Sequence, residues 1–166
     1  MKTVITYGTF DLLHHGHVRI LKRLRNMGDR LIVGLSTDEF NREKGKKTIL
    51  PYDARKEVLE AVRYVDGVFP EISWDQKRDD IIRVRAAILG MGHDWAGKFD
   101  ELEEIVEVRY IPRTESVSTT EIKQAAARYN AEQIMILRNY LNEAVEIAQK
   151  LTQTNEVTAI DLKQSS

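Results

Sequence analysis

Segments typical of β-strands alternate with segments typical of α-helices along most of this chain, and this alternation restricts the fold more than any other feature of the sequence. The strand-like segments are short and apolar, whereas the segments between them are amphipathic. The predicted strands cover residues 2–7, 31–35, 68–69, 86–91 and 106–111, and the predicted helices cover about 18–25, 53–64, 76–83 and 118–129. Strands separated by helices pair in parallel through crossover connections. We therefore predict an α/β fold with a doubly wound, mostly parallel five-stranded sheet.

Composition excludes several classes of protein. With 166 residues, of which 42% are hydrophobic, the chain can bury the core of one globular domain. Its formal net charge of −1 lacks the basic surplus that nucleic-acid binding needs, so we expect no nucleic-acid partner. The absence of cysteine excludes disulfides and thiolate metal sites, and it fits a reducing compartment. No apolar run reaches the length of a membrane span and residues 1–5 lack a signal-peptide pattern, so we expect a cytoplasmic protein.

The character of the chain changes near residue 130. We predict a domain over residues 1–129, followed by a helical C-terminal extension and polar tail over residues 130–166. Apolar residues of the extension follow the alternating three- and four-residue spacing of coiled-coil core positions; they are Ile134, Leu137, Leu141, Ala144, Ala148 and Leu151. This helix packs either on its own domain or against a second subunit, and we expect a homodimer.

Three of the four histidines lie within four residues, directly after the first predicted strand. They are His14, His15 and His17, and the fourth, His93, follows the fourth predicted strand. In parallel α/β sheets, ligands bind beyond the carboxyl ends of the strands. The loops that start at Gly8, Ser36, Gly92 and Pro112 should therefore meet at one crevice, and two of these loops contain all four histidines.

The pattern His14-x-Gly16-His17 opens the first predicted helix. Free N–H groups and a partial positive charge at a helix N-terminus favour phosphate, and Gly16 permits a close approach by the ligand. Two imidazoles at this position suit a phosphoryl group. The same pattern is also compatible with a metal site, which would need a third ligand such as His93 or Asp11, and with an ordinary protein surface.

Residues 7–17 read YGTFDLLHHGH and residues 113–120 read RTESVSTT. These two motifs, at this spacing, resemble those of the cytidylyltransferase superfamily. The segments LSTDEFN (35–41), RYVD (63–66) and MGHDWAGKFD (91–100) resemble the members that use glycerol 3-phosphate. The resemblance covers about residues 1–128 and implies a Rossmann-like nucleotidyltransferase fold.

The resemblance also implies a reaction. Members of this superfamily join CTP to an alcohol phosphate and release pyrophosphate, so CTP and glycerol 3-phosphate are the expected partners, with Mg²⁺ bound to the CTP. A phosphate monoester is largely dianionic at neutral pH and can attack the α-phosphorus without a general base. Catalysis then depends on positioning and electrostatics. We expect His14 and His17 to donate hydrogen bonds to the phosphates, and no dedicated protein metal site is required.

By the same resemblance, the catalytic set is His14, His17, Lys44, Lys46 and Arg113. The expected nucleotide-binding residues are Gly8, Thr9, Phe10, His14, Gly16, His17, Gly92, Asp94, Trp95, Arg113, Thr114, Ser118 and Thr119. The expected substrate-binding residues are Asp11, Lys44, Lys46, Arg55, Arg63 and Trp74.

Within these sets the roles differ. The two lysines lie in a basic segment, residues 42–47, that we expect to be mobile. Asp94 and Trp95 are expected at the cytosine, and Arg113 with Ser118 and Thr119 at the outer phosphates. For Trp74, packing in the core is as strongly favoured as contact with the substrate.

Two positions depart from the superfamily pattern. Gly90 stands where a bulky apolar residue is usual, which loosens the core unless a neighbouring side chain fills the gap, and Ser116 replaces a glycine. Three alternative functions remain at this stage. They are transfer to another acceptor, such as phosphoethanolamine or a heptose phosphate, a nucleotide-binding regulator without turnover, and a tRNA-charging enzyme, whose family shares the His-x-Gly-His pattern.

Overall fold

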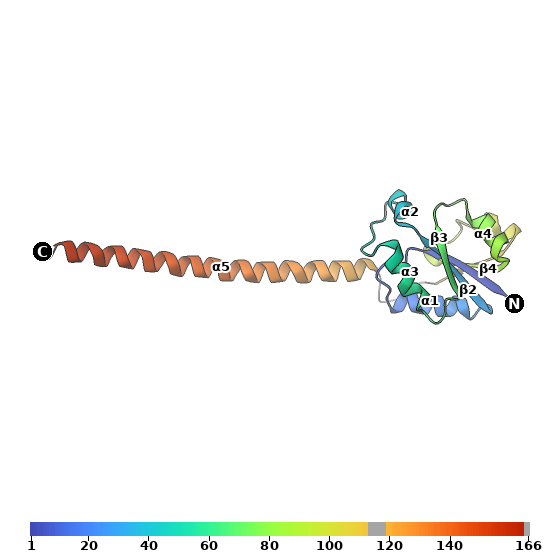
Figure 1. Cartoon of the computed structure of the whole chain (residues 1–166), viewed down its shortest axis with the longest axis horizontal. Coiled ribbons are helices and arrows are strands. Elements are labelled where there is room, and N and C mark those ends of the chain that lie inside the picture. Colours follow the sequence, from blue (N-terminus) through green and yellow to red (C-terminus); the bar gives the residue numbers. More distant parts are fainter. Residues whose placement is uncertain (113–118, 165–166) are drawn as a thin grey trace. The chain divides into compact units, whose positions relative to one another are not determined.

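Five strands form one sheet in the computed structural model, and every pair of neighbouring strands runs parallel (Figure 1). The structure describes residues 1–112 and 119–164, with side chains described up to residue 143. The strands are β1 (Thr3–Gly8), β2 (Arg30–Ser36), β3 (Gly67–Glu71), β4 (Ala86–Gly92) and β5 (Glu107–Ile111), in the spatial order β3-β2-β1-β4-β5. The predicted five-stranded parallel sheet is confirmed.

Helices cover both faces of this sheet. They are α1 (His15–Arg25), α2 (Asp38–Glu43), α3 (Tyr52–Glu60), α4 (Lys77–Val84), the short 3₁₀ helices η1 (His93–Trp95) and η2 (Asp100–Glu104), and α5 (Thr119–Gln164). One buried cluster joins the sheet to Leu21 of α1 and Leu59 of α3. A second cluster, on the other face, joins it to Ile81 of α4 and Leu102 of η2. The fold is therefore doubly wound.

Strand β1 occupies the middle of the sheet. It pairs with β2 from Thr3 to Gly8 and with β4 from Thr3 to Ile5. Its neighbouring residues Val4 and Ile5 are completely buried and belong to the clusters on opposite faces. The strand order reverses direction between β1 and β4, and the carboxyl end of β1 therefore lies at the point where such sheets bind ligands.

Contacts between residues divide the chain into Met1–Thr119 and Thr120–Ser166. The sequence predicted a helix that ends near residue 129 and a separate extension, whereas α5 is one helix from Thr119 to Gln164. Neither proline nor glycine occurs between these residues, so no residue in that stretch breaks the helix. Among residues 1–112 and 119–164, no helix is both long and apolar enough to cross a membrane.

Helix α3 corrects one prediction. The sequence predicted a helix over residues 53–64 that is capped by Asp53 and buries Val58 and Ala61. The observed helix ends at Glu60, its N-cap is Pro51, and both Val58 and Ala61 are exposed. Its buried residues are Arg55 and Leu59, which are four apart and share one helix face. An arginine therefore occupies a position that the hydrophobic pattern could not assign to the core.

The core is not loosened at Gly90, because a neighbouring side chain fills the gap. A Cβ atom placed on Gly90 would lie 2.1 Å from Cδ2 of Leu24. Leu24 projects from α1, is completely buried and belongs to the main cluster. The leucine side chain therefore fills the space that a larger residue at position 90 would occupy, and glycine permits this close packing of α1 on β4.

Gly90→Ala should lower the free energy of unfolding by about 1–3 kcal/mol, because the added methyl group overpacks against Leu24. Urea denaturation measures this change. Gly92→Ala is the matched control, since a Cβ there would lie 4.0 Å from the nearest atom, Cδ1 of Ile20. Equal stability of the two variants would contradict the packing argument.

Candidate active site

The segment after β1 leaves the sheet in an unusual backbone conformation. Phe10 and Leu12 have φ angles of 46° and 47°, in the left-handed region that residues other than glycine rarely adopt. A Cβ on Gly8 would lie 2.7 Å from Cε2 of Phe10, so the ring folds back over the glycine. Such backbone strain persists only where the surrounding structure holds it, and it often marks functional sites.

His14 and His17 form the start of α1. His14 is the N-cap residue, and its Nδ1 accepts a hydrogen bond from the backbone N–H of Gly16 at 3.1 Å. Nδ1 of His17 accepts from the backbone N–H of His14 at 3.4 Å, which completes a capping box. The two rings stack with centroids 3.9 Å apart. The structure therefore brings both predicted imidazoles together at a helix N-terminus.

The hydrogen bonds define the proton positions on these rings. A ring nitrogen that accepts an N–H carries no hydrogen itself, so Nε2 carries the hydrogen in both His14 and His17. Burial, reinforced by the neighbouring His14, lowers the pKa of His17 from 6.5 to about 4, although Asp11 opposes this change. His17 is therefore neutral at pH 7, with an Nε2–H donor.

Asp11 is buried and anchors a distant backbone segment. Its carboxylate oxygens accept the backbone N–H groups of Ile49 and Leu50 at 2.9 and 3.1 Å. Its backbone carbonyl accepts the hydroxyl of Thr119 at 2.9 Å, so the first residue of α5 contacts the segment after β1. The carboxylate also lies near enough to His17 to affect its pKa.

Arg55 is almost completely buried and holds three parts of the chain together. Its guanidinium donates to the carbonyl of Thr9 at 2.7 Å, to the carbonyl of Leu50 at 3.1 Å and to Asp38 Oδ1 at 2.6 Å. Burial opposes ionisation of Asp38, but the backbone N–H of Tyr52 and the Arg55 guanidinium lower its pKa below the ordinary value. Arg55 therefore fixes the backbone of Thr9, next to the imidazole pair.

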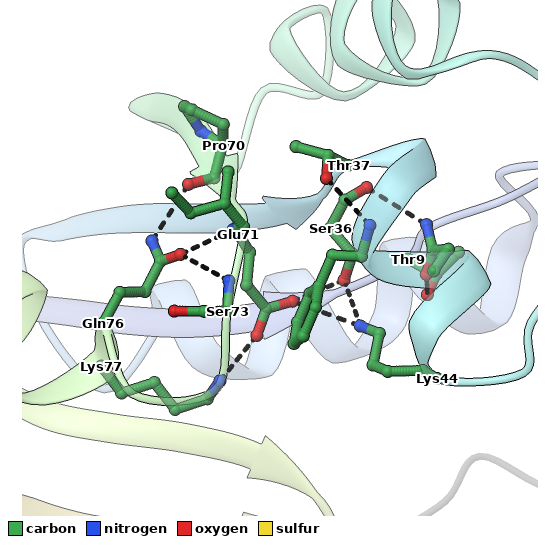
Figure 2. A network of polar contacts seen from close by, with 12 residues as sticks. Thr9, Ser36, Thr37, Lys44, Pro70, Glu71, Ser73, Gln76 and Lys77 are labelled. Carbon is green, nitrogen blue, oxygen red and sulfur yellow. Dashed lines mark hydrogen bonds and ion pairs between the residues drawn. The ribbon is translucent and has the colours of Figure 1, made fainter.

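Lys44 is held in place, although its segment was expected to be mobile. That expectation is wrong for Lys44, because its side chain is only 7% exposed. Its ammonium donates to the Ser36 hydroxyl at 2.7 Å and lies 3.5 Å from Glu71, as Figure 2 shows. Burial lowers the pKa of Lys44, and the Glu71 carboxylate opposes that change. The Glu71 carboxylate neutralises only part of the charge of this buried ammonium, so the ammonium suits an anionic ligand.

Sequence reasoning missed four buried polar residues around Lys44: Ser36, Asn41, Glu71 and Lys77. Asn41 accepts the Thr9 hydroxyl at 2.8 Å and donates to the carbonyl of Ser36 at 3.2 Å. Glu71 accepts from Ser36 and from Lys77, the latter at 2.6 Å (Figure 2). Glu71 and Asn41 end or follow strands at the edge where ligands bind, and that position is the signal that could have identified them.

Aromatic side chains line one side of this polar network. Trp74 is 41% exposed and contacts Phe40 and Trp95, with ring centroids 5.3 and 5.2 Å away. Its partial exposure does not match the alternative of pure core packing. The Lys46 ammonium lies 5.4 Å from the centre of the Trp95 ring, so Lys46 and the loop after β4 are also neighbours.

The remaining predicted residues are less closely grouped. Gly92 ends β4, and Asp94 is exposed in η1. Arg63 is exposed after α3, 5.9 Å from the Tyr64 ring. Arg113, Thr114 and Ser118, as well as the divergent Ser116, lie outside the described residues. Within the described part of the chain, no group of three His, Cys, Asp or Glu residues could hold a metal ion, so the alternative of a histidine metal site finds no third ligand there.

The lowered pKa of His17 makes folding stability depend on pH. Because the unfolded chain binds a proton on this residue near pH 6.5 and the folded chain only near pH 4, stability is full above 6.5 and falls as the pH drops toward 4. Urea denaturation of His17→Asn between these pH values should show a shallower decline than the parent protein. His93→Asn, which alters an exposed histidine, should keep the parental slope, and an unchanged slope in His17→Asn would contradict the assignment.

Comparison with known proteins agrees with this geometry. Residues 5–125 match the family described as Cytidylyltransferase-like. Glycerol-3-phosphate cytidylyltransferase of Staphylococcus aureus is 57% identical over 124 residues, which span 75% of this chain and 94% of that protein. The Bacillus subtilis protein of the same name is 55% identical over 127 residues, which span 76% of this chain and 98% of that protein.

A solved structure extends the likeness to the fold. The lipopolysaccharide core biosynthesis protein of Thermoplasma volcanium superposes with a TM-score of 0.61 at 25% identity, over 70% of this chain and 99% of that one. Together, the matched motifs and the parallel sheet identify the chain as a member of the cytidylyltransferase-like family. Its sequence is identical to those of two glycerol-3-phosphate cytidylyltransferases at more than half of the aligned positions.

Proposed function

We propose that this chain transfers the cytidylyl group of CTP to sn-glycerol 3-phosphate, giving CDP-glycerol and pyrophosphate. The observation that carries the proposal is the stacked pair His14 and His17, which presents Nε2–H donors at the N-terminus of α1. The names and the identity of the relatives support the choice of acceptor. The product would supply glycerol phosphate units to a teichoic-acid-type or capsular polymer.

In the proposed reaction, a phosphate oxygen of glycerol 3-phosphate attacks the α-phosphorus of CTP. The new P–O bond forms as the bond to the β-phosphate breaks, and pyrophosphate leaves with that electron pair. The acceptor phosphate is largely dianionic at neutral pH, so no side chain has to remove a proton. The two Nε2–H donors and the ammonium groups of Lys44 and Lys46 stabilise the charge on the transferring group.

The other predicted residues complete the proposed site. Asp94 and Trp95 would contact the cytosine, while Arg113, Thr114, Ser118 and Thr119 would contact the outer phosphates. We propose that CTP enters as its magnesium complex, because Mg²⁺ keeps several waters and takes its other ligands mainly from substrate phosphates. We propose a cytoplasmic enzyme, since a sequence without cysteine fits a reducing compartment.

His17→Ala should lower turnover by ~10²–10³-fold, because it removes a hydrogen-bond donor to the transition state. The measurement is pyrophosphate release from CTP with glycerol 3-phosphate, alongside a urea denaturation curve. His15→Ala is the control, since His15 is exposed and neighbours the pair without belonging to the proposed set. A loss of stability that accounts for the whole loss of turnover would make His17 structural.

The same assay identifies the acceptor. Glycerol 3-phosphate should give the highest kcat/KM in a panel with phosphoethanolamine and a heptose phosphate. A clear preference for another member of the panel would refute the named acceptor. CTP binding without pyrophosphate release from any acceptor would refute turnover and favour a regulator.

We further propose that the enzyme is a homodimer joined through α5. Six large side chains between residues 134 and 141 are 46–67% exposed: Ile134, Met135, Ile136, Leu137, Tyr140 and Leu141. Only Ile134, Leu137 and Leu141 share one helix face and can be buried against a single partner helix. Each can remove on the order of 100 Å² from water, and the rest of the about 800 Å² per partner in a typical interface has to come from other parts of the chain. Acidic and basic residues nearly balance along α5, which favours a second copy of this helix over an anionic membrane.

Sedimentation equilibrium tests this interface. The full chain should be a dimer, and Leu137→Glu should shift it to monomer, because a charge in a coiled-coil seam stays buried without a partner. Asn139→Glu places the same charge at an exposed polar position of the helix and should leave the dimer intact. A monomeric parent protein, or a Leu137→Glu variant that stays dimeric, would refute the interface.

A further inference from the structure

The imidazole of His17 contacts two other rings. It stacks on His14, with ring centroids 3.9 Å apart, and it packs against Phe10, with centroids 5.3 Å apart and an angle of 59° between the ring planes. His14 belongs to the proposed catalytic pair. The Phe10 side chain, in contrast, has no group that can donate a hydrogen bond or move a proton, so its contact with His17 needs a separate explanation.

Phe10 is fixed by the hydrophobic core. It is 8% exposed and belongs to the main cluster, which also contains Leu21 and Leu24 of α1. His17 and Leu21 are four residues apart, so both lie on the face of α1 that is turned toward this cluster. The Phe10 ring therefore extends the core as far as the imidazole at the start of the helix.

Gly8 makes room for the Phe10 ring. A Cβ atom at Gly8 would lie 2.7 Å from Cε2, 3.1 Å from Cδ2 and 3.3 Å from Cζ of Phe10. The shortest of these distances is one that real Cβ atoms essentially never show, so any other residue at position 8 would displace the ring. The chain also turns at Phe10, where φ is 46°, a value rare for residues other than glycine. A glycine and a strained turn thus bring this ring to His17.

Polar contacts hold the His17 imidazole only weakly. The hydrogen bond from the backbone N–H of His14 to Nδ1 of His17 is 3.4 Å long, whereas such bonds are usually ~2.9–3.0 Å. A hydrogen-bond donor stabilises a transition state best when it is oriented before the reaction begins. The direction of the Nε2–H donor of His17 therefore depends on ring packing, to which Phe10 contributes from the core.

The same contact affects the charge of His17. A hydrocarbon ring keeps water away from the imidazole, and loss of water disfavours the protonated form. Burial is the largest cause of the low pKa of His17, which agrees with this contact. His14 and Asp11 are the titratable groups that act on His17 in the described part of the chain, and their effects on its pKa oppose each other.

We propose that Phe10 is a positioning residue for the transfer reaction: its side chain holds the His17 imidazole in the orientation that directs Nε2–H at the transferring phosphoryl group. This inference rests on the proposed cytidylyltransferase function and deepens it. In this role Phe10 acts through His17, and its ring need not touch the reacting atoms.

Phe10→Leu tests the proposal, because it removes the ring and keeps an apolar side chain. Leu12 has a φ of 47°, so leucine is compatible with the backbone angle at position 10. NMR titration of the imidazole C–H resonances should show the pKa of His17 rising from about 4 toward 6.5, as water reaches the ring. In the pyrophosphate assay kcat should fall by ~10–100-fold with a much smaller change in KM, because orientation in the transition state is lost.

Phe69→Leu is the matched control. Phe69 also packs against the core, and its ring contacts Tyr7, with centroids 5.9 Å apart, and no histidine ring in the described part of the chain. This variant should keep the parental pKa of His17 and the parental kcat. An equal rise of that pKa, or an equal loss of turnover, in Phe69→Leu would overturn the proposal.

Gly8→Ala displaces the same ring without changing it. Its Cβ would collide with Cε2 of Phe10, so the pKa of His17 should again rise. Urea denaturation identifies any variant that fails to fold. If both variants fail, Phe10→Met carries the test, because its flexible side chain fills the space without a ring.

The NMR titration needs no turnover, and this separates the inference from the proposed function. A parent protein inactive with CTP and glycerol 3-phosphate would refute the proposed function. An unchanged His17 pKa in the folded Phe10 variants would refute the role of Phe10. A raised pKa with parental kcat would also refute it, since the ring would then bury the imidazole without orienting it for the reaction.

Discussion

The pairing of β1 with both β2 and β4 is the constraint on which the rest of the structure depends. Strand β1 lies in the middle of a parallel sheet, with β2 and β3 on one side and β4 and β5 on the other. The connections toward β2 and β3 cross one face of the sheet, and those toward β4 and β5 cross the opposite face. The carboxyl end of β1 thus opens at the reversal of strand order. The segment that follows can reach the ends of β2 and β4 only by a sharp turn, which Phe10 and Leu12 make with strained backbone angles.

Buried polar contacts then hold that segment in place. Arg55 binds the carbonyl of Thr9, and Asp11 binds the backbone at Ile49 and Leu50. Each of these groups would be costly to bury without its partners, so the contacts specify one arrangement of the segment. His14 and His17 are presented on this rigid support, and the same burial that fixes His17 keeps it neutral. Electrostatic catalysis needs donors that are already oriented before the reaction begins.

About a quarter of this chain lies outside its match with the glycerol-3-phosphate cytidylyltransferases. The glycerol-3-phosphate cytidylyltransferases of Staphylococcus aureus and Bacillus subtilis align over nearly their whole length with about three quarters of this chain. Most of α5 lies beyond that match. Its exposed apolar residues have no use in the proposed chemistry, which is why we assign them to contact between subunits. Within the family, FAD synthase of Pyrococcus horikoshii and the bifunctional protein HldE of Campylobacter concisus are also similar to this chain, at 32% and 41% identity.

Much of the fold and part of the candidate site could be predicted from the sequence. The order of strands and helices, the parallel sheet and the position of His14 and His17 at a helix start follow from hydrophobic periodicity and short motifs, which are local properties of the chain. The structure alone revealed that Leu24 fills the space at Gly90, that Arg55 is buried and that Lys44 is fixed. It also revealed the ion pair between Glu71 and Lys44, and the position of the Lys77 ammonium among three aromatic rings. These contacts link residues far apart in sequence, such as Arg55 and Thr9, and no local pattern encodes which distant partner neutralises a given charge. That choice depends on the tertiary structure, because only burial makes an unpaired charge costly enough to require a particular partner.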